Sequence, residues 1–178
     1  QIEDCYGLTA LQPEIYRRYC DTGNPLANVT QAVSIMEGPV DKSLLQAVWQ
    51  ALVARHKVLR TRFLLDADGE PVQVVCKHAD FALTELDYSH LDEPAQQHAL
   101  SQLQIKDRLT RYDLSKAPAL RLYLVTLSPQ TGRFAIVMSN HQIILDGWTS
   151  SLLSKDLIMC LISMASGKAL PAMQHQPD

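Results

Sequence analysis

Two apolar runs joined by a polar loop decide the fold class of this chain. Residues 119–139 read ALRLYLVTLSPQTGRFAIVMS. Both runs are rich in branched and aromatic residues, and the loop at residues 128–132 contains the proline and glycine that are typical of turns. The pattern predicts two adjacent strands, over residues 119–127 and 133–139, that form a hairpin.

Helical patterns precede and follow this hairpin. A first helix is predicted from Thr9–Gln12, a capping-box pattern, to Tyr19. Asp41 and Asp92 are typical N-caps for helices that end near residues 55 and 109. The polar side of the second of these, which includes Gln96, is expected to face water. A long apolar helix is predicted to follow the hairpin and to end near residue 166, before Gly167.

Further strands complete the pattern. They are predicted over residues 29–36, 59–65, 72–76 and 81–86, and Asp68-Gly69 supplies a turn between the second and third of them. Helices and hairpins mixed around one sheet predict an α/β (α+β) sandwich, with a mixed sheet flanked by helices.

Composition excludes several classes of protein. The 178 residues are 47% hydrophobic with a formal net charge of -3, so we expect a real core, no nucleic-acid partner and no membrane association. The four cysteines, Cys5, Cys20, Cys76 and Cys160, form no CxxC pair, which predicts free thiols in a reducing cytoplasm and no metal site. The chain begins at Gln1 without an initiator Met, which suggests an excerpt from a longer protein.

The segment after the hairpin concentrates the polar chemistry. Residues 140–148 read NHQIILDGW, with His141 and Asp146 on either side of an apolar spacer. Asp146 alone would be interpreted as a helix N-cap. The spacer is expected to lie in the core and to hold its polar neighbours in place. No GxSxG, GxGxxG or GxxxxGK[ST] pattern competes with this segment.

Three segments resemble one known family. Residues 141–148, HQIILDGW, resemble the HHxxxDG signature of condensation domains in nonribosomal peptide synthetases. Residues 55–63, RHKVLRTRF, are similar to the family's RHxxLRTxF motif, and residues 2–12, IEDCYGLTALQ, resemble its opening segment in the form found in fungal synthetases. Order and spacing agree over essentially the whole chain.

The resemblance implies both a fold and a reaction. The fold is one lobe of a two-lobed chloramphenicol-acetyltransferase-like domain, with residues 1–170 as the N-terminal, donor-side lobe and residues 171–178 as the start of the interlobe linker. The reaction joins a carrier-bound acyl or peptidyl thioester to a carrier-bound aminoacyl amine. The implied partners are the carrier domains, whose phosphopantetheine arms hold the substrates, and the C-terminal lobe. The lobe itself is implied to bind no cofactor.

The resemblance also implies roles for particular residues. His141 takes the position of the first, supporting His, and Gln142 takes the position of the catalytic His. Asp146 is expected to hold the site together through a salt bridge to Arg60, and Gly147 to offer a backbone N–H near the reacting thioester.

Gln142 is a departure from the family pattern, because a carboxamide does not titrate near neutral pH. Four explanations are open. The domain is naturally inactive, the His was replaced by design, or Gln142 acts by positioning alone. In the fourth, His141 itself is the catalytic residue. A catalytically silent, carrier-binding relative, a coenzyme A-dependent acyltransferase and an inert fragment remain as other functions. Because the chain lacks both the second lobe and the catalytic His, the isolated chain is expected to form no amide.

Overall fold

The computed structural model describes residues 1–81, 83–145 and 147–168. The elements in chain order are β1 (Ile2–Gly7), α1 (Gln12–Thr22), β2 (Val29–Glu37), α2 (Lys42–Arg55), the 3-10 helix η1 (Lys57–Arg60), β3 (Thr61–Leu65), β4 (Pro71–Cys76), β5 (Leu83–Asp87), α3 (Glu93–Leu109), β6 (Leu120–Ser128), β7 (Arg133–His141) and α4 (Gly147–Ala165). None of the described helices combines the length and apolarity needed to cross a bilayer.

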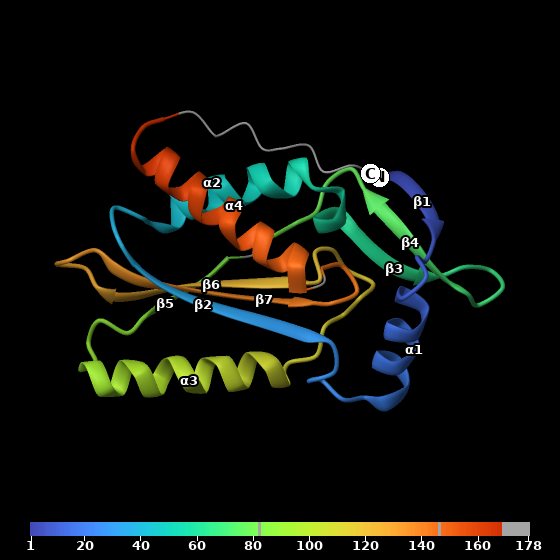
Figure 1. The fold of residues 1–178 in the computed structure, drawn as a ribbon, viewed down its shortest axis with the longest axis horizontal. Coiled ribbons are helices and arrows are strands. Elements are labelled where there is room, and N and C mark those ends of the chain that lie inside the picture. Colours follow the sequence, from blue (N-terminus) through green and yellow to red (C-terminus); the bar gives the residue numbers. More distant parts are fainter. Residues whose placement is uncertain (82, 146, 169–178) are drawn as a thin grey trace.

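A four-stranded mixed sheet forms the centre of the molecule. Its order is β2-β7-β6-β5, with β5 parallel to β6 and the other neighbours antiparallel. Helices α2 and α4 cover one face and α3 covers the other, which gives three layers (Figure 1). Alternate residues of β7 serve the two faces: Ile136 belongs to the large core cluster under α2 and α4, and Val137 to a smaller cluster with α3.

The decisive hairpin is confirmed. Strands β6 and β7 pair over residues 120–140 as an antiparallel ladder, and Gly132 in the loop has a φ of 69°. A side chain there would be strained, and its Cβ would lie 2.9 Å from the carbonyl oxygen of Gly38. Strand β7 continues to His141, two residues beyond its predicted end, because β2 pairs with it as far as that residue.

The predicted helix caps are largely confirmed. The side chains of Asp41 and Asp92 accept hydrogen bonds from the backbone N–H groups of Leu44 and Ala95, at 2.8 and 2.9 Å. Helix α1 begins at Gln12 with Leu11 as its N-cap, so the predicted cap at Thr9 is wrong.

The structure corrects the prediction of a single sheet. Strands β3 and β4 form a separate three-stranded antiparallel sheet with β1, in the order β1-β4-β3. All six residues of β1 are exposed, so the strand has no apolar alternation from which it could be predicted. The start of the predicted strand over residues 59–65 is also wrong, because Leu59 is buried in η1 instead.

The prediction that Gln96 faces water is wrong. Its side chain is buried, and its amide donates hydrogen bonds to the carbonyl oxygens of Leu127 and Tyr88 at 2.7 and 3.1 Å.

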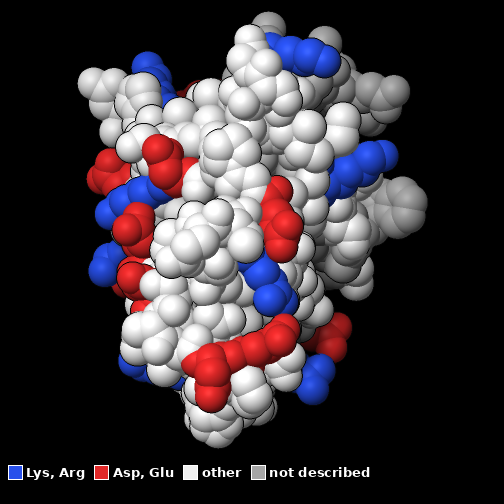
Figure 2. All heavy atoms as spheres, turned by 90° about the vertical axis from the view of Figure 1, so that its left-hand side faces the viewer, with Lys and Arg blue, Asp and Glu red and all other residues white. Residues whose placement is uncertain are grey.

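The surface charge is mixed: Figure 2 shows basic and acidic side chains interspersed over one end of the molecule, with uncharged surface between them.

A buried carboxylate joins the end of α3 to the central sheet. Asp107 accepts hydrogen bonds from Arg121 Nε at 2.6 Å, Gln31 Nε2 at 2.8 Å and the Tyr123 hydroxyl at 2.9 Å. Burial alone would raise the pKa of Asp107, but hydrogen bonds, with that from Ser139 foremost, together hold this pKa below its usual value. The carboxylate therefore stays ionised in the folded chain.

Replacing this carboxylate by an amide tests its contribution to stability. We expect Asp107→Asn to lower the free energy of unfolding by about 3 kcal/mol, because the guanidinium of Arg121 loses its charged partner. Chemical denaturation of the chain measures the change. Asp68→Asn, an exposed loop position, is the matched control, and equal stability of the two variants would contradict this role.

Candidate functional site

The candidate site is the connection between β7 and α4. His141 is the last residue of β7, and α4 begins at Gly147. The apolar spacer between them lies in the core, as predicted: Ile143, Ile144 and Leu145 are 2%, 6% and 2% exposed. The polar side chains before the spacer are therefore attached to rigid, buried backbone.

His141 is a fully buried ring. It makes a T-shaped contact with the ring of Tyr19, with the centroids 4.3 Å apart at an interplanar angle of 72°, and the centroid of the Tyr112 ring lies 6.0 Å away. Its Nδ1 accepts a hydrogen bond from the backbone N–H of Ile143 at 3.2 Å. An imidazole that accepts at Nδ1 carries its proton on Nε2, and Nε2 is buried without a hydrogen-bond partner among the described residues.

The surroundings of His141 disfavour its charged form. Desolvation by burial lowers the pKa of His141 from 6.5 to about 4, so the ring is neutral at pH 7. An enclosed, neutral ring that already bonds the backbone two residues on is suited to structural support. It is poorly suited to take a proton from a substrate.

Gln142 is half-buried and fastened to the segment that leads into β2. Its backbone N–H donates to the carbonyl oxygen of Asn28 at 2.7 Å. Its side-chain Oε1 accepts from Asn28 Nδ2 at 3.2 Å, and its Nε2 donates to Thr30 Oγ1 at 3.4 Å. The carboxamide is thus oriented at both ends, and the contacts among the described residues use one N–H and one lone pair of it.

A cleft opens beside Gln142, between the β2–β7 edge of the sheet and α4. It has a volume of about 200 Å³, and Thr30, which binds Gln142, is part of its wall. The other lining residues include Ala32 and Met138 from the sheet and Ser154 from α4. Hydroxyl, amide and apolar groups make up the described wall, and none of these lining side chains is ionisable.

Two predicted site residues lie at the far end of the connection. Gly147 is the first residue of α4, where a helix presents its unpaired N–H groups. Asp146 lies outside the described residues, so its proposed role as partner of Arg60 stays a prediction.

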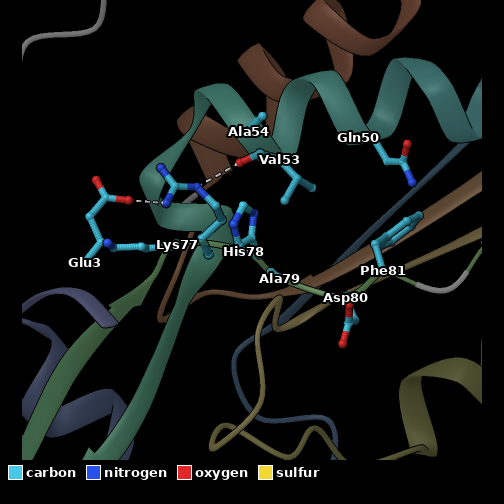
Figure 3. A pocket seen from close by; sticks show the side chains of 10 residues that line it. Glu3, Gln50, Val53, Ala54, Lys77, His78, Ala79, Asp80 and Phe81 are labelled. Atoms are coloured by element: carbon cyan, nitrogen blue, oxygen red, sulfur yellow. Dashed lines mark hydrogen bonds and ion pairs between the residues drawn. The ribbon is translucent and has the colours of Figure 1, made fainter. Parts of the chain in front are cut away.

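The structure gives Arg60 other partners. Its Nη1 donates to the Glu3 carboxylate, and its Nε donates to the carbonyl oxygen of Val53 at 3.1 Å (Figure 3). Nη1 also donates to the carbonyl oxygen of Cys76 at 2.6 Å. The hydrogen bond from Arg60 lowers the pKa of Glu3. Arg60 therefore joins β1, β4 and the end of α2, and Glu3 is a partner that the sequence reasoning missed because β1 was not predicted.

Arg60 also forms part of the wall of a pocket of about 460 Å³ at the edge of the small sheet. Lys77 brings positive charge to this wall, and Glu3 and Asp80 bring negative charge (Figure 3). Among the described residues, no group of three or more His, Cys, Asp or Glu side chains is placed to hold a metal ion.

Arg60 should contribute to stability through its buried hydrogen bonds. We expect Arg60→Lys to lower the free energy of unfolding by about 1–3 kcal/mol, because an ammonium group cannot reach all three oxygens and leaves a buried carbonyl without a donor. Urea denaturation measures this change in the free energy of unfolding. Arg62→Lys, on the adjacent strand, is the control, and a loss no larger than in that control would argue against the clamp.

The buried His141 should make stability depend on pH. The unfolded chain takes up a proton near pH 6.5 and the folded chain only near pH 4, so stability present at pH 7 is lost as the pH falls through this interval. The loss is on the order of 3 kcal/mol. We expect His141→Phe to remove this part of the pH dependence in denaturation curves, while exposed His78→Phe retains it. Identical pH dependence in the wild type and His141→Phe would refute the assignment.

Comparison with known proteins identifies the family to which the chain belongs. The family model "Condensation domain" matches residues 2–177. The chain is 33% identical over 99% of its length to a linear gramicidin synthase of Brevibacillus parabrevis, and 30% identical over 99% to gramicidin S synthase 2 of Brevibacillus brevis. It spans only 2% and 4% of the lengths of these relatives. The predicted likeness to fungal forms stays a prediction.

Solved structures show the same fold. The first condensation domain of the calcium-dependent antibiotic synthetase, in complex with a substrate analogue, matches with a TM-score of 0.84 and 24% identity. The starter condensation domain of rhizomide synthetase matches with a TM-score of 0.84 and 18% identity. These matches cover 97% and 96% of this chain and 40% of each solved chain. With the family model matched over nearly all of its length, the chain belongs to the condensation domain family of nonribosomal peptide synthetases.

Proposed function

We propose that this chain is the N-terminal, donor-side lobe of a condensation domain that forms an amide between two carrier-bound substrates. The observation that carries the proposal is the oriented Gln142 carboxamide, held on rigid backbone at the second-His position of the family signature. The match to two-fifths of each solved condensation domain chain supports assignment to one lobe. The substrates are thioesters on the phosphopantetheine arms of carrier domains, and the second lobe would close the site.

The reaction sets the demands on these residues. The amine nitrogen of the acceptor attacks the thioester carbonyl carbon, the C–N bond forms, the C–S bond breaks, and the thiol leaves with the proton that the nitrogen loses. Negative charge develops on the carbonyl oxygen, and an N–H aimed at that oxygen lowers the barrier. The backbone N–H of Gly147, at the start of α4, is the donor we propose for it.

Gln142 can orient the amine but cannot accept its proton. The second lone pair of Oε1 is able to accept a hydrogen bond from the attacking amine. The proton passes to the leaving thiolate or to solvent instead. Orientation of two bound reactants can supply on the order of 7 kcal/mol or more of the barrier reduction, so a site without a titrating base is chemically workable.

The cleft beside Gln142 supports a position on the donor side. An acyl thioester carries no charge at its reacting end, and the described wall of the cleft holds no ionisable side chain. Met138 and Ala32 offer apolar surface, and Thr30 offers a hydroxyl at the end nearest Gln142.

A second function is favoured by one observation. Both ends of the Gln142 carboxamide already bind the protein, through Asn28 and Thr30, which is the arrangement expected of a residue that serves structure. The alternative is a catalytically silent lobe that binds loaded carrier domains without turnover.

Amide formation by the full-length synthetase that contains this chain distinguishes the two functions. We expect the pH dependence of amide formation by the Gln142 protein to follow the ionisation of the acceptor amine alone, because no group at position 142 titrates. Gln142→His should add a limb near pH 6.5 and raise the rate by about 100-fold or more, as general-base catalysis does.

Two further results decide between the catalytic and the silent function. Gln142→Ala should reduce amide formation, because orientation is lost along with the carboxamide. Capture of loaded carrier with no amide product from the Gln142 protein at any pH would support the silent function and overturn the catalytic one. We expect no amide from the isolated chain of 178 residues.

A further inference from the structure

The opening motif of the chain reaches the connection after β7 through one side chain. Gln12, the first residue of α1, donates from Nε2 to the carbonyl oxygen of Ile143 at 3.0 Å and to Oε1 of Gln73 at 3.1 Å. Its own Oε1 accepts from the backbone N–H of Thr9 at 2.8 Å. Both N–H groups and one lone pair of this carboxamide are therefore used.

The orientation of Gln12 is fixed by its neighbours. Gln73 is buried in β4 and donates from Nε2 to the carbonyl oxygen of Gly7 at 3.3 Å, so its Oε1 is turned toward Gln12. The Thr9 N–H fixes the opposite end of the Gln12 carboxamide. These contacts leave Gln12 one orientation in which its N–H groups face Ile143 and Gln73.

The carbonyl that Gln12 binds lies in the middle of the candidate site. Ile143 follows Gln142 directly and is buried, so its carbonyl oxygen needs a donor from the protein. Asn140, within β7, donates to the carbonyl oxygen of Leu145 at 3.2 Å. Gln12 supplies the corresponding bond to Ile143 from a different element and thereby ties the connection to α1 and, through Gln73, to the small sheet.

We propose that Gln12 is a positioning residue: it fixes the backbone at Ile143, directly after Gln142, and so sets where the Gln142 carboxamide points. The inference rests on the proposed amide-forming function of this connection. Loss of the Gln12 donor would leave the Ile143 carbonyl unpaired and let the connection shift. A displacement of about 1 Å of a reacting geometry can lower a rate by about 100-fold.

The variant Gln12→Glu tests this role with little change in shape. Glutamate keeps an oxygen for the Thr9 N–H, but it turns a charged oxygen toward the oxygens of Ile143 and Gln73. In the full-length synthetase we expect kcat to fall by about 10- to 100-fold at pH 8, with KM changed less than about twofold. Lowering the pH to 6 should restore part of kcat relative to the wild type at the same pH, because the facing oxygens and partial burial raise the pKa of this carboxyl and its protonated form donates one hydrogen bond again.

Controls separate positioning from general damage. Gln102→Glu makes the same change on the exposed side of α3 and should leave kcat and its pH dependence unchanged. If Gln12→Glu does not fold, Gln12→Met keeps the length without charge and should lower kcat with no recovery at pH 6. Wild-type kcat in a folded Gln12 variant would overturn the proposal.

A structural readout distinguishes failure of this inference from failure of the proposed function. Hydrogen–deuterium exchange of the chain should be faster at the amides of residues 143–145 in Gln12→Glu, and unchanged in β6. If the wild-type synthetase forms no amide, the proposed function fails, and exchange still decides the role of Gln12. Unchanged exchange at residues 143–145 would overturn the positioning role of Gln12.

Discussion

The burial of a neutral imidazole at the end of β7 is the constraint on which the site depends. His141 has no exposed surface, and it bonds its own chain through Nδ1 and the Ile143 N–H. That bond turns the backbone from strand into connection. If the ring were charged, its desolvation would lower the stability of the folded chain. The ring acts together with the Asn28 and Gln12 contacts, which hold Gln142 and the carbonyl of Ile143.

The packing around His141 extends the constraint to distant segments. The Tyr19 hydroxyl, on α1, donates to the carbonyl oxygen of Tyr112, and the Tyr112 hydroxyl lies 2.8 Å from Ser139 Oγ in β7. The guanidinium of Arg121 stacks on the Tyr112 ring at 3.8 Å and pairs with Asp107. A contiguous set of buried polar contacts thus connects α1, the segment before β6 and the end of α3 to the candidate site. Such networks are stabilising only while every member keeps its partner.

Much of this arrangement could be predicted from the sequence, because it follows from local patterns. The hairpin of β6 and β7, the caps Asp41 and Asp92 and the buried spacer all rest on periodicity or on short-range hydrogen bonds. Strand β1 could not be predicted, because its six exposed residues carry no pattern and backbone pairing with β4 alone defines it. The burial of Gln96 was missed for a related reason: its acceptors, Tyr88 and Leu127, lie outside its own helix.

The candidate site shows the same division. Gln142 and Gly147 were located through a motif, whereas the Arg60–Glu3 pair and the Gln12–Ile143 contact join residues far apart in the chain, and no short-range signal announces them. Pairings of this kind depend on how whole elements pack. The three motifs are nevertheless physically related, since the opening segment reaches the other two through Gln12 and Glu3.

The most direct test of this account is the protonation state of His141 itself. Nitrogen-15 NMR of the labelled chain should show one neutral tautomer with the proton on Nε2, and this signal should not titrate between pH 5 and pH 8. A His141 signal that titrates near pH 6.5, as a solvated imidazole does, would contradict the account, because the ring would then be neither buried nor held neutral.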